Sequence, residues 1–179
     1  MKKKKAKALI VEDETRMRRV LIMLLSDFDL EFVEAEDGLQ AVDAFDVERF
    51  DLVITDIKLP KSNGMDVLTH VKEKDPDLPV IVITAFGSID SAVMAIRRGA
   101  FDYVTKPFKE ERLRECVKKA LRISRLTSEV RHLRQEVEAK YNFDNIIGNS
   151  PQICNVLQLA GDVARTDTSV LITGESGTG

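Results

Sequence analysis

Short apolar runs alternate with amphipathic stretches between residues 6 and 108. The runs are rich in β-branched residues, which favours strands, whereas apolar residues recur every three or four positions in the amphipathic stretches, which favours helices. The pattern predicts strands at Ala6–Val11, Leu30–Ala35, Leu52–Thr55, Pro79–Thr84 and Phe101–Val104. It predicts helices at Thr15–Leu25, Gly38–Val47, Met65–Val71, Ser88–Arg97 and after Pro107.

These elements form five successive βα units. Continuously apolar strands alternating with amphipathic helices indicate a parallel sheet that is covered on both faces. We therefore predict an α/β fold with a doubly wound five-stranded sheet. In such folds ligands bind outside the carboxyl ends of the strands.

Composition changes this picture little. Apolar residues make up 44% and charged residues 32% of the 179 residues, and the net charge is −3, which is ordinary for a globular protein and gives no sign of nucleic-acid binding. No apolar run approaches the roughly 18 residues that span a bilayer, and Ala8–Val11 is too short for a signal-peptide core. Cys116 and Cys154 lack CxxC spacing, so we expect free thiols and a cytoplasmic protein. Because no apolar run is long enough to span a bilayer, we expect no membrane partner.

Chemically active side chains follow the predicted strands. Glu12 and Asp13 follow the first strand, Asp56 the third, Thr84 ends the fourth, and Lys106 follows the fifth. All five are therefore expected at one edge of the sheet. Each could separately be a helix cap or a loop residue, but ionised carboxylates seldom gather unless they are paired or bind a cation.

This set of residues suits phosphoryl transfer. A hard divalent cation such as Mg²⁺ relieves repulsion between carboxylates, and a lysine and a hydroxyl can bind phosphoryl oxygens. The reaction depends mainly on positioning and charge neutralisation. Asp56, which alone ends the central strand, is the expected acceptor, and an aspartyl phosphate is a known covalent intermediate.

Five segments carry a family resemblance: Ile10–Glu14, Ile54–Pro60, Asn63-Gly64, Ile83–Ala85 and Val104–Phe108. Through them residues 8–122 resemble the receiver domain of a two-component response regulator. The resemblance implies a flavodoxin-like sheet with strand order 2-1-3-4-5. It also implies a sensor histidine kinase as the partner that supplies the phosphoryl group.

The resemblance assigns roles to individual residues. It implies that Mg²⁺ is held by Glu12, Asp13, Asp56 and the backbone carbonyl of Lys58. Thr84 and Lys106 would bind phosphoryl oxygens, and Tyr103 would be the switch aromatic that turns inward as Thr84 moves. Without the resemblance, Tyr103 could simply be a half-buried strand residue. By the same resemblance, Lys58 and Phe86 lie where side chains modulate hydrolysis, and their size predicts slow self-dephosphorylation.

A charged helix without breakers follows the fifth βα unit. Apolar residues at spacings of 3, 4, 3 and 4 occupy a and d positions of a coiled coil: Ile123, Leu126, Val130, Leu133 and Val137. Glu129 at g and Arg134 at the next e could pair in a parallel homodimer that also uses the receiver. About two heptads are marginal alone. One amphipathic helix that packs on its own domain is the alternative.

The end of the chain carries an incomplete nucleotide-binding signature. An apolar run at 169–173 is expected to be a strand and leads into Gly174, Glu175, Ser176, Gly177, Thr178 and Gly179, a glycine-rich loop without its following lysine. Residues 141–179 resemble the opening of the AAA+ ATPase domain of sigma-54-dependent activators of the NtrC type. We expect no ATP hydrolysis by this chain, because about 39 residues cannot bury a core. ATP, sigma-54 RNA polymerase and DNA would be partners only of a full-length parent.

The predicted organisation is a receiver domain at 1–122, a coiled-coil linker at 123–140 and an incomplete ATPase segment at 141–179. A phosphatase of the haloacid-dehalogenase type would need a second aspartate where Lys58 stands. A flavin or nucleotide binder would need a phosphate-cradling loop where Glu12, Asp13 and Glu14 would repel phosphate. We therefore predict a phosphorylation-activated response regulator that switches its oligomeric state, or else a stand-alone receiver that acts by protein contact.

Overall fold

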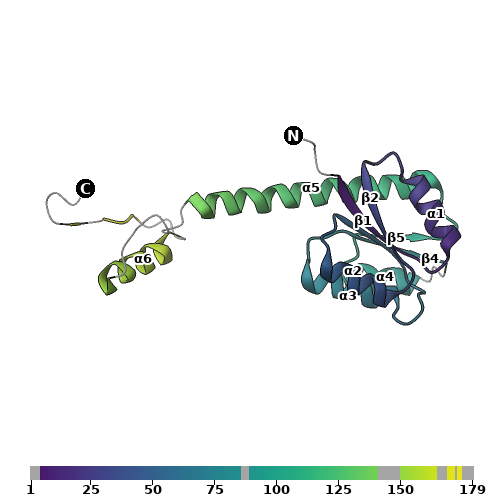
Figure 1. Cartoon of the computed structure of the whole chain (residues 1–179), viewed down its shortest axis with the longest axis horizontal. Coiled ribbons are helices and arrows are strands. Elements are labelled where there is room, and N and C mark those ends of the chain that lie inside the picture. The colour runs from purple at the N-terminus through teal and green to yellow at the C-terminus, as the bar shows by residue number, and fades with distance from the viewer. Residues whose placement is uncertain (1–4, 86–88, 141–149, 165–168, 172, 175–179) are drawn as a thin grey trace. The chain divides into compact units, whose positions relative to one another are not determined.

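The structure is a computed structural model that describes residues 5–85, 89–140, 150–164, 169–171 and 173–174. The chain divides into two compact units, Met1–Arg131 and His132–Gly179. The first unit contains a parallel sheet with helices on both of its faces (Figure 1).

The sheet has the predicted number and order of strands. All four neighbouring pairs are parallel, and the order is β2-β1-β3-β4-β5. The strands are β1 (Ala6–Val11), β2 (Leu30–Ala35), β3 (Leu52–Asp56), β4 (Val80–Thr84) and β5 (Asp102–Thr105). The predicted doubly wound, flavodoxin-like fold is confirmed, and β3 is its central strand.

Helices connect the strands as the apolar spacing predicts. They are α1 (Thr15–Leu24), α2 (Gly38–Val47), α3 (Gly64–Lys74), α4 (Ile89–Arg97), α5 (Glu110–Lys140) and α6 (Pro151–Val163). The main difference is α3, which is longer at both ends than the predicted Met65–Val71. Polar residues extend it: Asn63 caps its start, and Lys72 and Lys74 lie in its last turn, where cations are favourable.

Two apolar clusters fill the two faces of the sheet. Successive strand residues point to opposite faces. Leu9 of β1 therefore packs towards Val67 of α3, while its neighbour Ile10 packs towards Leu21 of α1 and Leu113 of α5. All five residues of β3 and of β4 are buried. This burial on both faces explains why the strands are continuously apolar.

The start of α3 is fixed against the end of β3. Asn63 Oδ1 accepts hydrogen bonds from the backbone N–H groups of Met65 (2.8 Å) and Asp66 (3.1 Å). Gly64 donates its N–H to the carbonyl of Ile57 at 2.9 Å. A Cβ atom at Gly64 would lie 1.8 Å from the carbonyl oxygen of Asp56, so only glycine permits this approach.

The second unit contains α6, whose first turn is capped by Ser150. The Ser150 hydroxyl accepts a hydrogen bond from the N–H of Ile153 at 3.3 Å. Residues 169–171 and 173, where a strand was predicted, have no strand structure, so that prediction is wrong for these residues. A strand needs a hydrogen-bonded neighbour, and no strand lies in the described part of this unit. Gly174 is exposed, and Glu175–Gly179 lie outside the described residues.

Across the described residues, no helix is both long and apolar enough to cross a membrane.

Candidate functional site

The parallel register places the predicted site residues around the end of β3. Asp56 is the last residue of β3 and pairs with Ile83 of β4, so Thr84 lies one residue beyond it on the neighbouring strand. Val11 of β1 pairs with Thr55, so the turn that begins at Glu12 lies on the other side of Asp56. The site therefore forms because three adjacent strands end at the same level.

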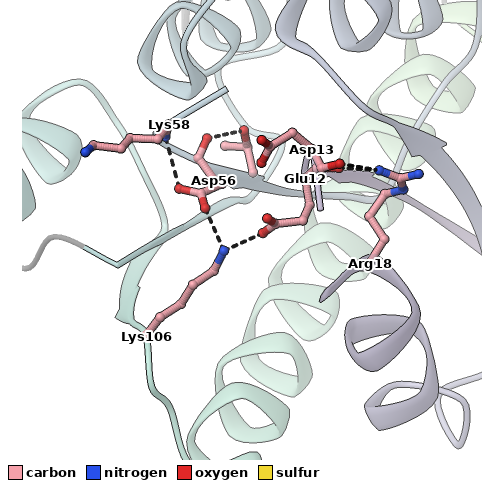
Figure 2. Close-up of polar contacts among 7 residues, drawn as sticks. Glu12, Asp13, Arg18, Asp56, Lys58 and Lys106 are labelled. Atoms are coloured by element: carbon pink, nitrogen blue, oxygen red, sulfur yellow. Dashed lines mark hydrogen bonds and ion pairs between the residues drawn. The ribbon is translucent and has the colours of Figure 1, made fainter. Parts of the chain in front are cut away.

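Lys106 joins two of the carboxylates. Its Nζ lies 2.6 Å from Oδ2 of Asp56 and 2.6 Å from Oε2 of Glu12 (Figure 2). Glu12 is 2% exposed and Asp56 is 6% exposed, so the ammonium group and both carboxylates are largely removed from water. The site thus holds a partly buried ammonium group between two buried carboxylates.

Burial and ion pairing act on the protonation of these groups. Burial raises the pKa of Glu12, and the hydrogen bond from Lys106 only partly opposes this effect. Burial lowers the pKa of Lys106, but its hydrogen bonds to Asp56 and Glu12 outweigh burial, and the pKa is raised overall. The Lys106 ammonium group therefore stays charged at neutral pH.

Both carboxylate oxygens of Asp56 are held. While Oδ2 accepts from Lys106, Oδ1 accepts from the backbone N–H of Lys58 at 3.0 Å. The Asp56 backbone carbonyl accepts a hydrogen bond from the hydroxyl of Thr55 at 2.9 Å. These contacts fix the orientation of a carboxylate that is the expected nucleophile, and they do so before any ligand arrives.

The remaining predicted residues lie around this centre. Asp13 is exposed beside Glu12. Thr84 is 1% exposed, and its carbonyl accepts a hydrogen bond from the N–H of Lys106 at 2.7 Å. Tyr103 is half-buried on β5, and its hydroxyl lies 3.4 Å from the Ser91 hydroxyl of α4. Phe86 lies outside the described residues.

The acidic residues have the ligand chemistry of a magnesium site, but two of their carboxylates are directed to the Lys106 ammonium group. Carboxylate and carbonyl oxygens, which Glu12, Asp13, Asp56 and Lys58 supply, are the ligands that Mg²⁺ prefers. Among the described residues, no three acidic, histidine or cysteine side chains converge as a metal site. Figure 2 shows the reason at Glu12 and Asp56, whose carboxylates both turn towards the Lys106 ammonium group.

Two contacts at this edge were missed in the sequence. Arg18 of α1 is 9% exposed and bonds to the turn after β1, and Lys61 pairs with the buried Asp37 at 2.6 Å. Arg18 could have been found, because it shares helical spacing with the buried Leu21 and Leu25 and a charge on that face needs a partner. No local pattern connects Lys61 to Asp37.

Comparison with known proteins agrees with the fold. Residues 8–118 match the response regulator receiver domain family, and residues 146–179 match the sigma-54 interaction domain. The chain therefore belongs to the response regulator receiver family.

Curated relatives and solved structures align with most of this chain. Regulatory protein AtoC of Escherichia coli (strain K12) is 36% identical over 171 residues, which cover 96% of this chain and 37% of that protein. The crystal structure of the signal receiver domain of a putative LuxO repressor from Vibrio parahaemolyticus is 32% identical, with a TM-score of 0.68 over 71% of this chain and 98% of that one. The structure of NtrX from Brucella abortus is 36% identical, with a TM-score of 0.66 over 91% of this chain and 35% of that one. The chain thus spans little more than a third of the curated relative.

Proposed function

We propose that this chain is the phosphorylation-controlled part of a sigma-54-dependent transcription activator, and that Asp56 accepts the phosphoryl group. The observation that carries the proposal is the Asp56 carboxylate itself. It ends the central strand, it is hydrogen-bonded at both oxygens, and a lysine ammonium lies 2.6 Å from one of them. Membership of the receiver family supports the same role.

The proposed donor is the phosphohistidine of a sensor kinase. A carboxylate oxygen of Asp56 attacks phosphorus, the bond from phosphorus to the histidine nitrogen breaks, and the histidine leaves with that electron pair. Lys106 neutralises negative charge on the transferred group, and the Lys58 N–H holds the nucleophile in line. Mg²⁺, when held by Glu12, Asp13, Asp56 and the carbonyl of Lys58, supplies further charge neutralisation for the phosphoryl oxygens.

The new charge would act on the neighbouring strand ends. Phosphorylation adds about −1.5 to −2 of charge at neutral pH, which attracts the Thr84 hydroxyl and the Lys106 ammonium. The backbone hydrogen bond between Lys106 and Thr84 makes these two residues move together. Tyr103 lies on β5 with its hydroxyl near Ser91 of α4, so a shift of Thr84 is relayed to the surface of α4, β5 and α5.

We further propose that the output is a change in homodimerisation through α5 and the receiver. The a and d side chains of α5 are about half exposed: Ile123 44%, Leu126 49%, Val130 49% and Leu133 53%. The side chain of Val137 lies outside the described residues.

A different face of α5 contacts its own domain. Ser124 is buried, and Arg131 pairs with Asp75 at 3.1 Å and with Asp77 at 3.5 Å. Positions 124 and 131 lie about 100° of helix rotation beyond the a positions 123 and 130. The apolar stripe is therefore not used by its own domain, which favours a partner helix over the alternative of a single amphipathic helix.

The wider partners belong to a longer protein. We propose that sigma-54 RNA polymerase, DNA and ATP act with such a parent, and that these 179 residues alone do not hydrolyse ATP. We place the action in the cytoplasm with the kinase. A receiver that acts only by protein contact is the second candidate, and it has the same site.

The test is phosphorylation with a small donor. The chain is incubated with Mg²⁺ and acetyl phosphate, and intact mass is measured for wild type and Asp56→Asn. We expect one phosphoryl group on wild type and none on the variant. An unmodified wild type, or an adduct that persists in Asp56→Asn, would contradict the proposal. Light scattering with and without beryllofluoride then reports whether the site controls assembly, which separates the two candidates.

A further inference from the structure

Arg18 is a buried charged side chain for which the proposed chemistry has no use. It lies in the first turn of α1, and its guanidinium reaches back towards the end of β1. Nη1 donates to the backbone carbonyls of Glu12 at 2.6 Å and of Asp13 at 3.3 Å. Nε donates to Oε2 of Glu34 at 3.0 Å, and Nη2 lies 3.4 Å from the Thr15 hydroxyl.

The turn that Arg18 holds has no side-chain cap. Glu14 is the N-cap residue of α1, and its side chain makes no capping hydrogen bond. On the strand side, the N–H of Glu12 donates to the carbonyl of Ala35 at 3.1 Å, which continues the sheet. The two carbonyls that follow, those of Glu12 and Asp13, bond to Arg18. Arg18 thus bonds to both backbone carbonyls of the turn that carries Glu12 and Asp13.

These contacts lie next to the acidic side chain of Glu12. Figure 2 shows Arg18 on one side of the Glu12–Asp13 turn, with Asp56 and Lys106 on the other. With both carbonyls bonded towards Arg18, the Glu12 carboxylate is directed to Lys106. Glu34, on the adjacent strand β2, fixes the guanidinium from a third direction.

We propose that Arg18 is a positioning residue for the magnesium ligands Glu12 and Asp13, which it orients through their backbone carbonyls. The inference rests on the proposed function, because it assumes that this acidic pair binds Mg²⁺. Arginine is needed because its planar fork can donate to two carbonyls and a carboxylate together, whereas a lysine ammonium cannot reproduce that geometry.

The two possible roles of Arg18, as a nearby positive charge or as a residue that orients the ligands, predict opposite changes in Mg²⁺ affinity. If Arg18 acted only as a nearby positive charge, Arg18→Met would remove repulsion and strengthen Mg²⁺ binding. If Arg18 orients the ligands, the same substitution weakens binding. Loss of a residue that orients metal ligands typically costs about 10- to 100-fold in metal affinity. The sign of the change therefore separates the two roles.

The experiment is a titration of the unphosphorylated 179-residue chain with MgCl₂ at neutral pH. Shifts of the backbone amide signals of Glu12, Asp13 and Lys58 in two-dimensional NMR spectra give the dissociation constant. We expect Arg18→Met and Arg18→Lys each to weaken binding about tenfold. The matched control is Arg19→Met, which removes the exposed neighbouring arginine and should leave affinity unchanged.

Glu34→Gln provides a second variant that keeps both carbonyl contacts. We expect Glu34→Gln to lose less Mg²⁺ affinity than Arg18→Met. Both variants should give the NMR spectrum of a folded protein. Unchanged or tighter binding in Arg18→Met, wild-type affinity in Arg18→Lys, or an equal loss in Glu34→Gln would each overturn the positioning role. Absence of Mg²⁺-dependent shifts in wild type would instead overturn the proposed metal site, and this inference with it.

Discussion

Lys106 Nζ and Asp56 Oδ2 lie 2.6 Å apart, although 50 residues separate them in the chain. The contact forms because β3 and β5 end at the same edge of the sheet, on either side of β4. It gives the expected phosphoryl acceptor a charge partner before any phosphoryl group arrives. The geometry therefore favours a site whose reactivity depends on this lysine.

Lys106→Met is expected to slow phosphorylation by acetyl phosphate about 100-fold. A preorganised donor aimed at developing charge is typically worth that factor or more. The rate is followed by intact mass, with Lys109→Met as the control for loss of an exposed lysine on the same segment. An unchanged rate in folded Lys106→Met would show that this ammonium group does not assist the transfer.

Lys58→Ala is expected to shorten the lifetime of the phosphorylated form. The exposed side chain of Lys58 lies two residues beyond Asp56, where it can shield the phosphoryl group from water, while its N–H, which an alanine retains, still holds Asp56. Phe86→Ala should act in the same direction. Decay is measured after removal of the donor, and faster decay in wild type than in either variant would rule out shielding.

Asp37→Asn is expected to destabilise the chain at neutral pH. Asp37 accepts hydrogen bonds from Lys61 Nζ at 2.6 Å and from the Gln40 N–H at 2.9 Å. Both hydrogen bonds lower the pKa of Asp37, and the one from Lys61 has the larger effect. Asparagine keeps an oxygen for the helix cap but removes the charge and the second acceptor oxygen, which bonds to Lys61.

The pH dependence of this effect has a defined sign. The pKa of Asp37 is lower in the folded than in the unfolded chain, where an aspartate has a pKa of about 3.9. The stabilisation is therefore fully present above the unfolded pKa and is lost as pH falls through the folded pKa. Urea unfolding of wild type and Asp37→Asn from pH 7 downwards should give a constant difference that shrinks only below that value. A difference that disappears near pH 6 would implicate another group.

The two cysteines are expected to differ sharply in reactivity. Cys116 is fully buried in the core beside Asp102, and burial, with a smaller contribution from that carboxylate, raises its pKa to about 12. Cys154 is exposed. Because the thiolate is the reactive form, an aromatic disulfide reagent at pH 8 should titrate one thiol in the native chain and two in denaturant. Cys154→Ser should abolish the native reaction, and two rapid native thiols would contradict the burial of Cys116.

Replacing the apolar stripe of α5 is expected to weaken the proposed homodimer. Burial of an aliphatic side chain contributes about 1.5 kcal/mol or more, and each substitution counts twice in a dimer. Leu126→Ser or Val130→Ser should therefore weaken association about 100-fold. Sedimentation equilibrium, with and without beryllofluoride, measures the change. Arg125→Ser on the same helix is the control, and equal effects of all three substitutions would argue against an a/d interface.

Most of the fold could be predicted because both faces of the sheet are buried. A strand such as Val80–Thr84 is apolar up to its last residue, so it is evident without knowledge of its neighbours. The gathering of Asp56 and Lys106 followed from the rule that parallel strands end at one edge. The strand predicted at 169–173 is absent at the described residues 169–171 and 173, because an apolar signal does not supply a pairing partner. Helical spacing indicates that Arg18 is buried, but not that it bonds to the turn after β1. The contact of Lys61 with Asp37 depends on side-chain reach, which spacing does not encode.

The close approach of Gly64 to Asp56 has a mechanical consequence. With no side chain between them, the first turn of α3 lies directly against the carbonyl of Asp56, the proposed phosphoryl acceptor. Because no side chain separates the two backbones, a displacement of the Asp56 backbone also displaces the start of α3, and a displacement of α3 also moves Asp56. A protein that binds α3 would therefore change the position of Asp56 without contacting its carboxylate.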